Sequence, residues 1–136
     1  MLLFLQIDSG EVTGLELYES GENYLETILV LKNKHGHVRS IDIARTLSFS
    51  KPSVSRAVSI LKKAGYITVD SGGLIELTTS GLIIAEKIYH RHTMLTEWLT
   101  AIGVDPETAS RDACRMEHVI SQETFEKIGA HIKSKR

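Results

Sequence analysis

The sequence has few residues that would cross-link the chain or anchor it in a membrane. Its one cysteine, Cys114, cannot form an intramolecular disulfide and fits a reducing cytosol. The apolar run at residues 1–7 is too short to span a bilayer and lacks the positive flank of a signal peptide. The chain also has no internal repeat and no low-complexity stretch. These absences predict a globular cytoplasmic protein that has no membrane partner.

Charges of one sign are missing from two segments. No Lys or Arg precedes Lys32, although several acids do, and no Asp or Glu lies between Asp42 and Asp70. The acid-free segment carries its own basic residues, which are Arg45, Lys51, Arg56, Lys62 and Lys63. The net charge of -1 therefore conceals a locally basic stretch. Binding to a polyanion needs such a local basic face rather than a basic protein, so nucleic acid stays among the candidate partners.

The spacing of apolar residues predicts a mostly α-helical chain whose first part is a winged helix-turn-helix. Helices are expected over about 17–34 and 41–47, with Ser40 as the cap of the second. A third helix has Pro52 in its first turn and ends at Gly65. Two short strands, 66–69 and 74–77, follow it, and the segment 70–73 between them has the composition of a hairpin turn.

The second part of the chain is expected to be all-helical. A long helix over about 81–101 would be capped by Thr79 or Ser80, a helix opened by Asp105 would reach about Val119, and Ser121 would begin the last. We therefore predict three regions. Residues 1–16 form a loosely held or disordered N-terminal arm, a helix extension or a mis-set start; residues 17–78 form the winged helix; residues 79–136 form the helical domain.

The N-terminal end of the third helix is the expected DNA-reading element. In a winged helix-turn-helix this helix enters the major groove of double-stranded DNA with its first residues nearest the base edges. Small hydroxyl residues suit phosphate and base-edge contacts there, and long basic side chains reach phosphate or guanine. Residues before the second helix add backbone contacts. The predicted DNA-binding residues are Arg39, Ser40, Ser50, Lys51, Pro52, Ser53, Ser55 and Arg56. The alternative is that this basic face is merely solvated.

A thiol, a carboxylate and an imidazole stand at helical spacing near the C-terminus. Cys114, Glu117 and His118 follow the pattern i, i+3, i+4, which puts them on one face of a helix. Soft, hard and borderline donors together suit a divalent transition metal better than calcium or magnesium. Two histidines lie on the long helix expected over about 81–101. His92 lies one turn from apolar Ile88 and is expected to face inward. His90, two positions away, is expected to face solvent.

The first helix contributes Asn23 and Glu26, which are three residues apart on one face. An inward-facing Glu on an apolar helix is costly unless it is paired or bound to a cation. Each candidate also has an ordinary interpretation when taken singly. His92 would be a core histidine, Glu26 a surface acid and Cys114 a small buried hydrophobe. Three helices that each present ligand-type side chains favour a metal site.

These motifs, in this order, resemble the diphtheria-toxin-repressor and manganese-transport-regulator family of metal-dependent transcriptional repressors. The resemblance runs from about Gly21 to Ile128, through residues 22–28, 50–56, 77–81, 89–92 and 112–119. It implies a regulator that binds a palindromic operator upstream of metal-uptake genes. It also implies a homodimer joined through residues 79–136, which would be the metal-binding and dimerisation domain. The metal ligands that it implies are Asn23, Glu26, His92, Cys114, Glu117 and His118.

The ligand set is a mixture of two branches of that family. Cys114 resembles the iron-responsive branch and Glu26 the manganese branch, while Asn23 stands where an Asp or Met is usual. A second metal site would need a carboxylate and an imidazole where Thr96 and Ser110 occur. Because thiolate is a soft ligand, iron(II) is the expected effector and manganese(II) the alternative. The end at Arg136 leaves no room for the SH3-like domain of some members.

Two other functions compete with this interpretation. One is a winged-helix regulator that senses an organic ligand or thiol oxidation through Cys114 and needs no metal. The other is an enzyme with Cys114 as nucleophile, but a helical thiol lacks an obvious oxyanion hole. The sequence also has no His-Glu-x-x-His motif and no phosphate-binding loop. We therefore expect neither an enzyme nor an organic substrate.

Overall fold

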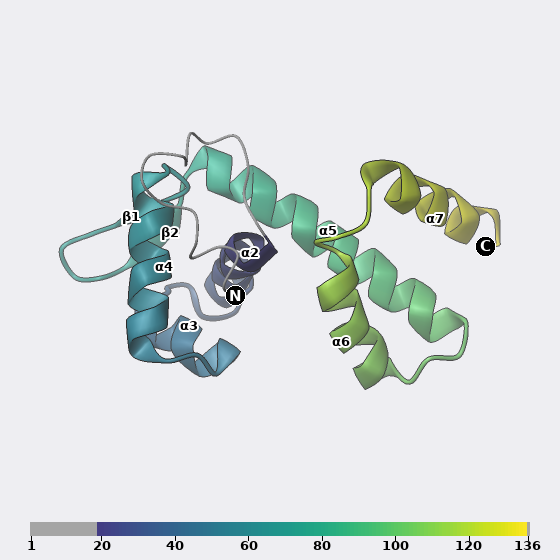
Figure 1. The fold of residues 1–136 in the computed structure, drawn as a ribbon, viewed down its shortest axis with the longest axis horizontal. Coiled ribbons are helices and arrows are strands. Elements are labelled where there is room, and N and C mark those ends of the chain that lie inside the picture. The colour runs from purple at the N-terminus through teal and green to yellow at the C-terminus, as the bar shows by residue number, and fades with distance from the viewer. Residues whose placement is uncertain (1–18, 136) are drawn as a thin grey trace. The chain divides into compact units, whose positions relative to one another are not determined.

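The computed structural model describes residues 19–135, and this part of the chain is mostly α-helical, as predicted. The predicted N-terminal arm, residues 1–16, lies outside the described residues. No described helix is both long and apolar enough to cross a membrane. The described elements are α2 (Glu19–His35), α3 (Ser40–Leu47), α4 (Lys51–Lys63), β1 (Ile67–Val69), β2 (Ile75–Leu77), α5 (Thr79–Ala101), α6 (Pro106–Met116) and α7 (Gln122–Ser134). They form two compact units that divide between residues 86 and 87, within α5 (Figure 1).

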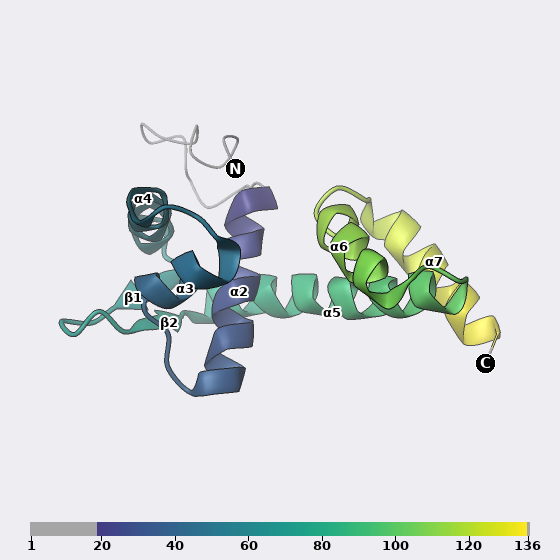
Figure 2. The same ribbon diagram turned by 90° about the horizontal axis from the view of Figure 1, so that it is seen from below.

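The N-terminal unit is a winged helix-turn-helix. Its core is the apolar side of α2, including Tyr24, Leu25 and Ile28, against which α3 and α4 pack. The strands pair antiparallel with Ile67 opposite Leu77, and the hairpin packs on α2 and α4. Both ribbon views show the turn of the hairpin extending away from these helices (Figures 1 and 2). The predicted wing is confirmed, although each strand is one residue shorter at its start.

The turn between α3 and α4 sets the direction of the DNA-reading helix. Ser48 ends α3 in the left-handed conformation, with φ 58° and ψ 38°, and its N–H donates to the Ala44 carbonyl. Phe49 then packs at a tilt on Tyr24, with ring centroids 6.0 Å apart. Burial raises the pKa of the Tyr24 phenol above its ordinary value. The chain is thus turned sharply and anchored in the core before Ser50 begins the next helix.

Three helix ends differ from the predicted ones. Ser40 is inside α3 rather than its cap, because the Asp42 carboxylate instead accepts the Arg39 backbone N–H at 2.8 Å. Thr78, rather than Thr79 or Ser80, receives the Gly81 N–H at the start of α5. Helix α6 ends at Met116, short of the predicted Val119. At the starts of α3 and α5, neighbouring residues of similar capping ability compete, so the sequence leaves the choice of cap open.

The C-terminal unit consists of the second part of α5 with α6 and α7 beside it (Figure 2). Ser121 caps α7 as predicted by accepting the Thr124 N–H at 3.0 Å. Helix α7 approaches α5 closely at Gly129, where a Cβ atom would lie 3.1 Å from the Met94 sulfur. The buried apolar residues of the unit are Ile88, Leu95, Ala109, Ala113 and Phe125. Helix α6 contacts α5 as well, through the Ser110 hydroxyl and the His92 ring.

Candidate metal centre and nucleic-acid interface

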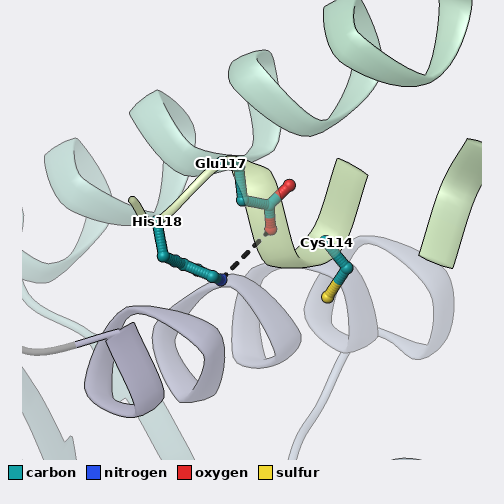
Figure 3. A group of neighbouring side chains, drawn as sticks. All are labelled: Cys114, Glu117 and His118. Carbon is teal, nitrogen blue, oxygen red and sulfur yellow. Dashed lines mark ion pairs between the residues drawn. The ribbon is translucent and has the colours of Figure 1, made fainter. Parts of the chain in front are cut away.

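Three side chains of different donor type meet where α6 ends (Figure 3). Cys114 lies in the last turn of α6, and Glu117 and His118 follow the helix. Glu117 keeps a helical backbone, with φ -60° and ψ -22°, and its N–H donates to the Ala113 carbonyl. The spacing i, i+3, i+4 therefore continues beyond the formal end of α6. As a result, the three side chains lie near one another, as their sequence positions predict.

The donor atoms of this group are close enough to share one ion. The Cys114 Sγ, a Glu117 carboxylate oxygen and a His118 ring nitrogen all lie within 4.8 Å of one another. His118 Nε2 is 3.3 Å from Glu117 Oε1, and the Glu117 side chain is fully buried. A buried carboxylate is costly unless it is paired or bound to a cation. One soft sulfur, one carboxylate oxygen and one imidazole nitrogen fit a divalent transition metal.

His92 faces the same group from α5, as predicted from its position one turn after Ile88. Its Nδ1 lies 2.9 Å from Glu117 Oε2, and its Nε2 lies 3.4 Å from the Ser110 hydroxyl. In the neutral ring, an Nδ1–H that donates to the carboxylate leaves Nε2 to accept from Ser110. His90 is exposed, also as predicted, and its ring meets Phe125 edge-on. Both oxygens of the Glu117 carboxylate thus lie beside imidazole nitrogens.

The six predicted metal ligands are divided between the two units. Four of them come together in the C-terminal unit, namely His92, Cys114, Glu117 and His118. Asn23 and Glu26 lie three residues apart on α2 of the N-terminal unit. The Glu26 side chain is buried, with 7% of its surface exposed, whereas Asn23 is half-buried. Burial of Glu26 on an apolar helix agrees with its predicted inward orientation.

The start of α4 presents a basic, acid-free surface. Ser50 caps the helix by accepting the Ser53 N–H at 3.2 Å, and its hydroxyl also donates to the Ser53 hydroxyl. No acid occurs in the first turn, so the helix terminus itself favours an anion. The residues of this segment that lie exposed are Ser50, Lys51, Pro52, Ser55 and Arg56, while Ser53 is half-buried. Within the described part of the chain, neither Lys51 nor Arg56 forms an ion pair.

Arg39 and Ser40, the other predicted DNA contacts, lie at the start of α3 beside the tip of the hairpin. The Arg39 Nε donates to the Gly72 carbonyl at 3.2 Å, which ties the tip of the hairpin to the start of α3. Beside it, the Ile75 N–H donates to the Val38 carbonyl at 2.8 Å. Ser40 is half-buried in the first turn of α3. Arg39 is exposed, so its guanidinium remains open to solvent while its Nε holds the wing.

Sequence reasoning missed one residue of this region, Arg91. It is 6% exposed and lies between His90 and His92 on α5. Its spacing in the sequence could have indicated that it is buried, because Arg91 follows Ile88 by three residues and precedes Leu95 by four. Those two residues belong to the buried apolar stripe of α5. A charged residue on such a stripe indicates a buried partner.

Comparisons with known proteins agree with this arrangement of two units. Residues 16–74 match the model of the iron-dependent repressor N-terminal DNA-binding domain. Residues 78–135 match the model of the iron-dependent repressor metal-binding and dimerisation domain. Together the two models account for most of the chain.

Several solved structures have a similar fold. The manganese regulator SloR is 24% identical over 83% of this chain, with a TM-score of 0.75. IdeR of T. acidophilum is 25% identical over 82%, with a TM-score of 0.73. The chain spans 53% of the length of each. A hypothetical protein from Sulfolobus solfataricus is 22% identical over 85% of this chain and 89% of its own, with a TM-score of 0.63.

Proposed function

The chain belongs to the iron-dependent repressor family, and from this premise we propose that it is a metal-dependent transcriptional repressor. It binds double-stranded DNA as a homodimer when it is loaded with a divalent transition metal, and it controls metal homeostasis. The observation that carries this proposal is the group of Cys114, Glu117 and His118 within 4.8 Å of one another. The chain is a regulator rather than an enzyme, it acts in the cytoplasm, and it needs no membrane and no organic substrate.

The metal is held by His92, Cys114, Glu117 and His118 of the C-terminal unit, and Asn23 and Glu26 of the N-terminal unit complete the ligand set. Support for the first four comes from their mutual distances and from the full burial of Glu117. Support for the α2 pair comes from the burial of Glu26 and from its spacing to Asn23. If the α2 pair joins the other four, the metal would be held by side chains from both units. Bound in this way, it favours those arrangements of the recognition helices that all ligands can reach.

Iron(II) is the proposed effector, and manganese(II) is the alternative. A thiolate ligand favours iron(II), cobalt(II), nickel(II) or zinc over manganese(II), and cytosolic availability selects iron(II) among them. Cys114 must lose its proton on binding, so it contributes strongly to the choice of metal. Glu26 and Asn23 add oxygen donors that manganese(II) accepts well.

Helix α4 reads the operator through its exposed N-terminal end. Lys51 and Arg56 bind phosphate or guanine, while Ser50, Pro52, Ser53 and Ser55 pack along the backbone and base edges. Arg39 and Ser40 add contacts to the phosphate backbone beside the wing. Because a dimer presents two such helices, the operator is palindromic, with half-sites about 34 Å apart, one turn of DNA.

The dimer forms through an exposed apolar surface of the C-terminal unit. Trp98, Ile102 and Ile132 line one hollow between α5 and α7, and 61% of the Ile102 surface is exposed. A charge placed at this surface weakens a mainly apolar interface. The Ile102→Glu variant should therefore sediment as a monomer at concentrations where the wild type is a dimer. Ile83→Glu, which changes an equally exposed isoleucine outside the C-terminal unit, is the matched control.

The central test measures DNA binding with and without metal. A pool of duplexes with randomised inverted repeats is selected on the iron(II)-loaded protein, and the selected duplex is then titrated by fluorescence anisotropy. Tight binding is expected with iron(II) or manganese(II) and should be lost in chelator. Equal affinity in chelator would contradict the proposal. The remaining explanation would then be a regulator that senses an organic ligand or thiol oxidation without metal. That alternative predicts that His92→Ala leaves DNA binding unchanged. Neither family model favours it.

A further inference from the structure

The guanidinium of Arg91 bridges α5 to the turn that connects α6 with α7. Its Nη1 donates to the carbonyls of Glu117 at 3.0 Å and Ile120 at 3.1 Å. Its Nη2 donates to Gln122 Oε1 at 2.8 Å, and its central carbon lies 5.2 Å from the centroid of the Phe125 ring. The side chain is almost completely buried. One cation therefore binds two carbonyls of the connection between the helices and one side chain at the start of α7.

One of these acceptors, the Glu117 carbonyl, is a group that the end of α6 leaves without a partner inside the helix, and the Ile120 carbonyl lies in the turn that follows. The last carbonyls of a helix have no N–H one turn ahead, and Ser121 already begins a new helix. A cation near the C-terminal end of a helix is favoured by the helix dipole. A planar guanidinium donates to several acceptors in a rigid fork geometry, whereas the three donors of an ammonium group rotate at the end of a flexible stem. The position therefore suits Arg specifically.

The clamped segment contains two of the proposed metal ligands. Arg91 bonds the main chain of Glu117 itself, and His118 is the next residue. His92, adjacent to Arg91 on α5, contacts the Glu117 carboxylate at 2.9 Å. Main chain and side chain of Glu117 are thus both held by consecutive residues of one helix. Free movement of residues 117–120 would separate the sulfur, oxygen and nitrogen donors.

We propose that Arg91 is a positioning residue for the metal centre. It holds the turn after α6 so that Glu117 and His118 stand ready beside Cys114 before a metal arrives. Holding the donors in place lowers the ordering cost of binding and so raises metal affinity. This inference rests on the proposed function, since it assumes that the cluster binds a metal.

A purely architectural role makes a different prediction. If Arg91 only joined two helices, its replacement would change stability and leave metal affinity alone. Loss of the guanidinium takes a donor from the Glu117 and Ile120 carbonyls and so costs stability in either role. Metal affinity and the mobility of residues 117–120 are therefore the quantities that separate the two roles.

The experiment titrates cobalt(II) into the metal-free, full-length protein under reducing conditions. Binding is followed by the thiolate-to-cobalt absorption band, which reports Cys114 directly. Arg91→Met should weaken cobalt(II) binding about 10- to 100-fold, as is typical when a residue that supports metal ligands is lost. The cobalt(II) affinity of Arg91→Lys should lie between those of the wild type and Arg91→Met, because an ammonium only partly replaces the guanidinium fork. Arg111→Met is the control, since Arg111 is exposed on α6 and bonds only Thr108 among the described residues.

Hydrogen exchange gives a second measurement that needs no metal. The N–H groups of Val119 and Ile120 both donate to the Met116 carbonyl. They should exchange faster in metal-free Arg91→Met than in the wild type, and at unchanged rates in Arg111→Met. If wild-type protein binds no cobalt(II), the proposed function fails, and this measurement still decides whether Arg91 holds the turn.

Three results would overturn the proposal. The first is wild-type cobalt(II) affinity in folded Arg91→Met. The second is unchanged exchange at Val119 and Ile120 in that variant. If Arg91→Met does not fold, the cobalt(II) titration uses Arg91→Lys and Gln122→Leu instead. Gln122→Leu removes only the side-chain oxygen that accepts from Arg91 Nη2. The third result is wild-type cobalt(II) affinity in both Arg91→Lys and Gln122→Leu.

Discussion

Cys114 contributes a sulfur donor to a cluster whose other members offer nitrogen and oxygen. A thiolate binds manganese(II) weakly compared with later first-row metals, whereas a carboxylate binds it well. The Cys114 sulfur lies within 4.8 Å of the Glu117 and His118 donors. Among the donors of this cluster, its replacement should therefore change the metal preference most.

The Cys114→Glu variant should shift the response from iron(II) towards manganese(II). The new carboxylate is a harder ligand at the same position, so the ratio of the two activating concentrations should change in favour of manganese. DNA binding by anisotropy, titrated with each metal under anaerobic conditions, measures that ratio. Cys114→Ser is the control, because it removes the thiolate without adding a charged ligand. A wild type that already responds to less free manganese(II) than iron(II) would contradict iron as the effector.

Ser48 illustrates a residue whose backbone rather than side chain is under strain. Its φ of 58° is unusual for a residue other than glycine. Ser48→Gly should raise the free energy of unfolding by roughly 0.5–1 kcal/mol, because glycine adopts this conformation without a Cβ clash. Ser59→Gly, on the exposed side of α4, should lower it by about 0.5 kcal/mol. Urea unfolding measures both, and a destabilised Ser48→Gly would contradict the strain argument.

The individual residues show what the sequence could and could not reveal. Local spacing was enough to place Cys114, Glu117 and His118 together, because all three lie within about one helical turn of chain. The contact of Arg91 with the Glu117 carbonyl joins positions 26 residues apart. No local pattern encodes such a contact. Its only trace in the sequence is a charged residue on an apolar stripe.

At the scale of elements, α4 combines a capped N-terminus with two exposed cations, Lys51 and Arg56, that form no ion pair with any residue in the range 19–135. Its existence followed from the stripe of Val54, Val58 and Leu61, all of which are buried. Its exact orientation did not follow, since this depends on the left-handed turn at Ser48 and on the contact of Phe49 with Tyr24. Helix type is thus a local property here, whereas helix direction is set by tertiary packing.

Lys51→Ala and Arg56→Ala should each weaken binding to the selected duplex while dimerisation and metal affinity stay unchanged. Loss of one phosphate contact should also reduce the slope of log affinity against log salt by about one unit. Anisotropy titrations at several salt concentrations provide both quantities. Lys62→Ala, at the opposite end of α4, is the control and should have little effect. Unchanged affinity and slope in both variants would make these cations part of a merely solvated surface.

For the whole molecule, the distribution of the proposed ligands matters more than any one of them. Four belong to the C-terminal unit and two to α2 of the DNA-binding unit. A metal held by ligands of one unit alone would have the same affinity whatever the recognition helices do. It would therefore shift no equilibrium between DNA-binding and non-binding arrangements. In the proposed ligand set this coupling would come from the α2 residues, and Glu26 is the buried acid of that helix.

Glu26→Gln should separate metal binding from its effect on DNA. The wild-type coupling factor is the ratio of operator affinities with and without metal, and such factors are typically about 5- to 150-fold. In Glu26→Gln this factor should fall towards one, while cobalt(II) still binds through Cys114 and gives its thiolate absorption. Cys114→Ser should instead lose the absorption itself. Glu19→Gln, an exposed acid at the start of α2, should keep the full factor. A full coupling factor in Glu26→Gln would show that Glu26 is not the link, because the metal would then act through the C-terminal unit and the remaining α2 donor, Asn23.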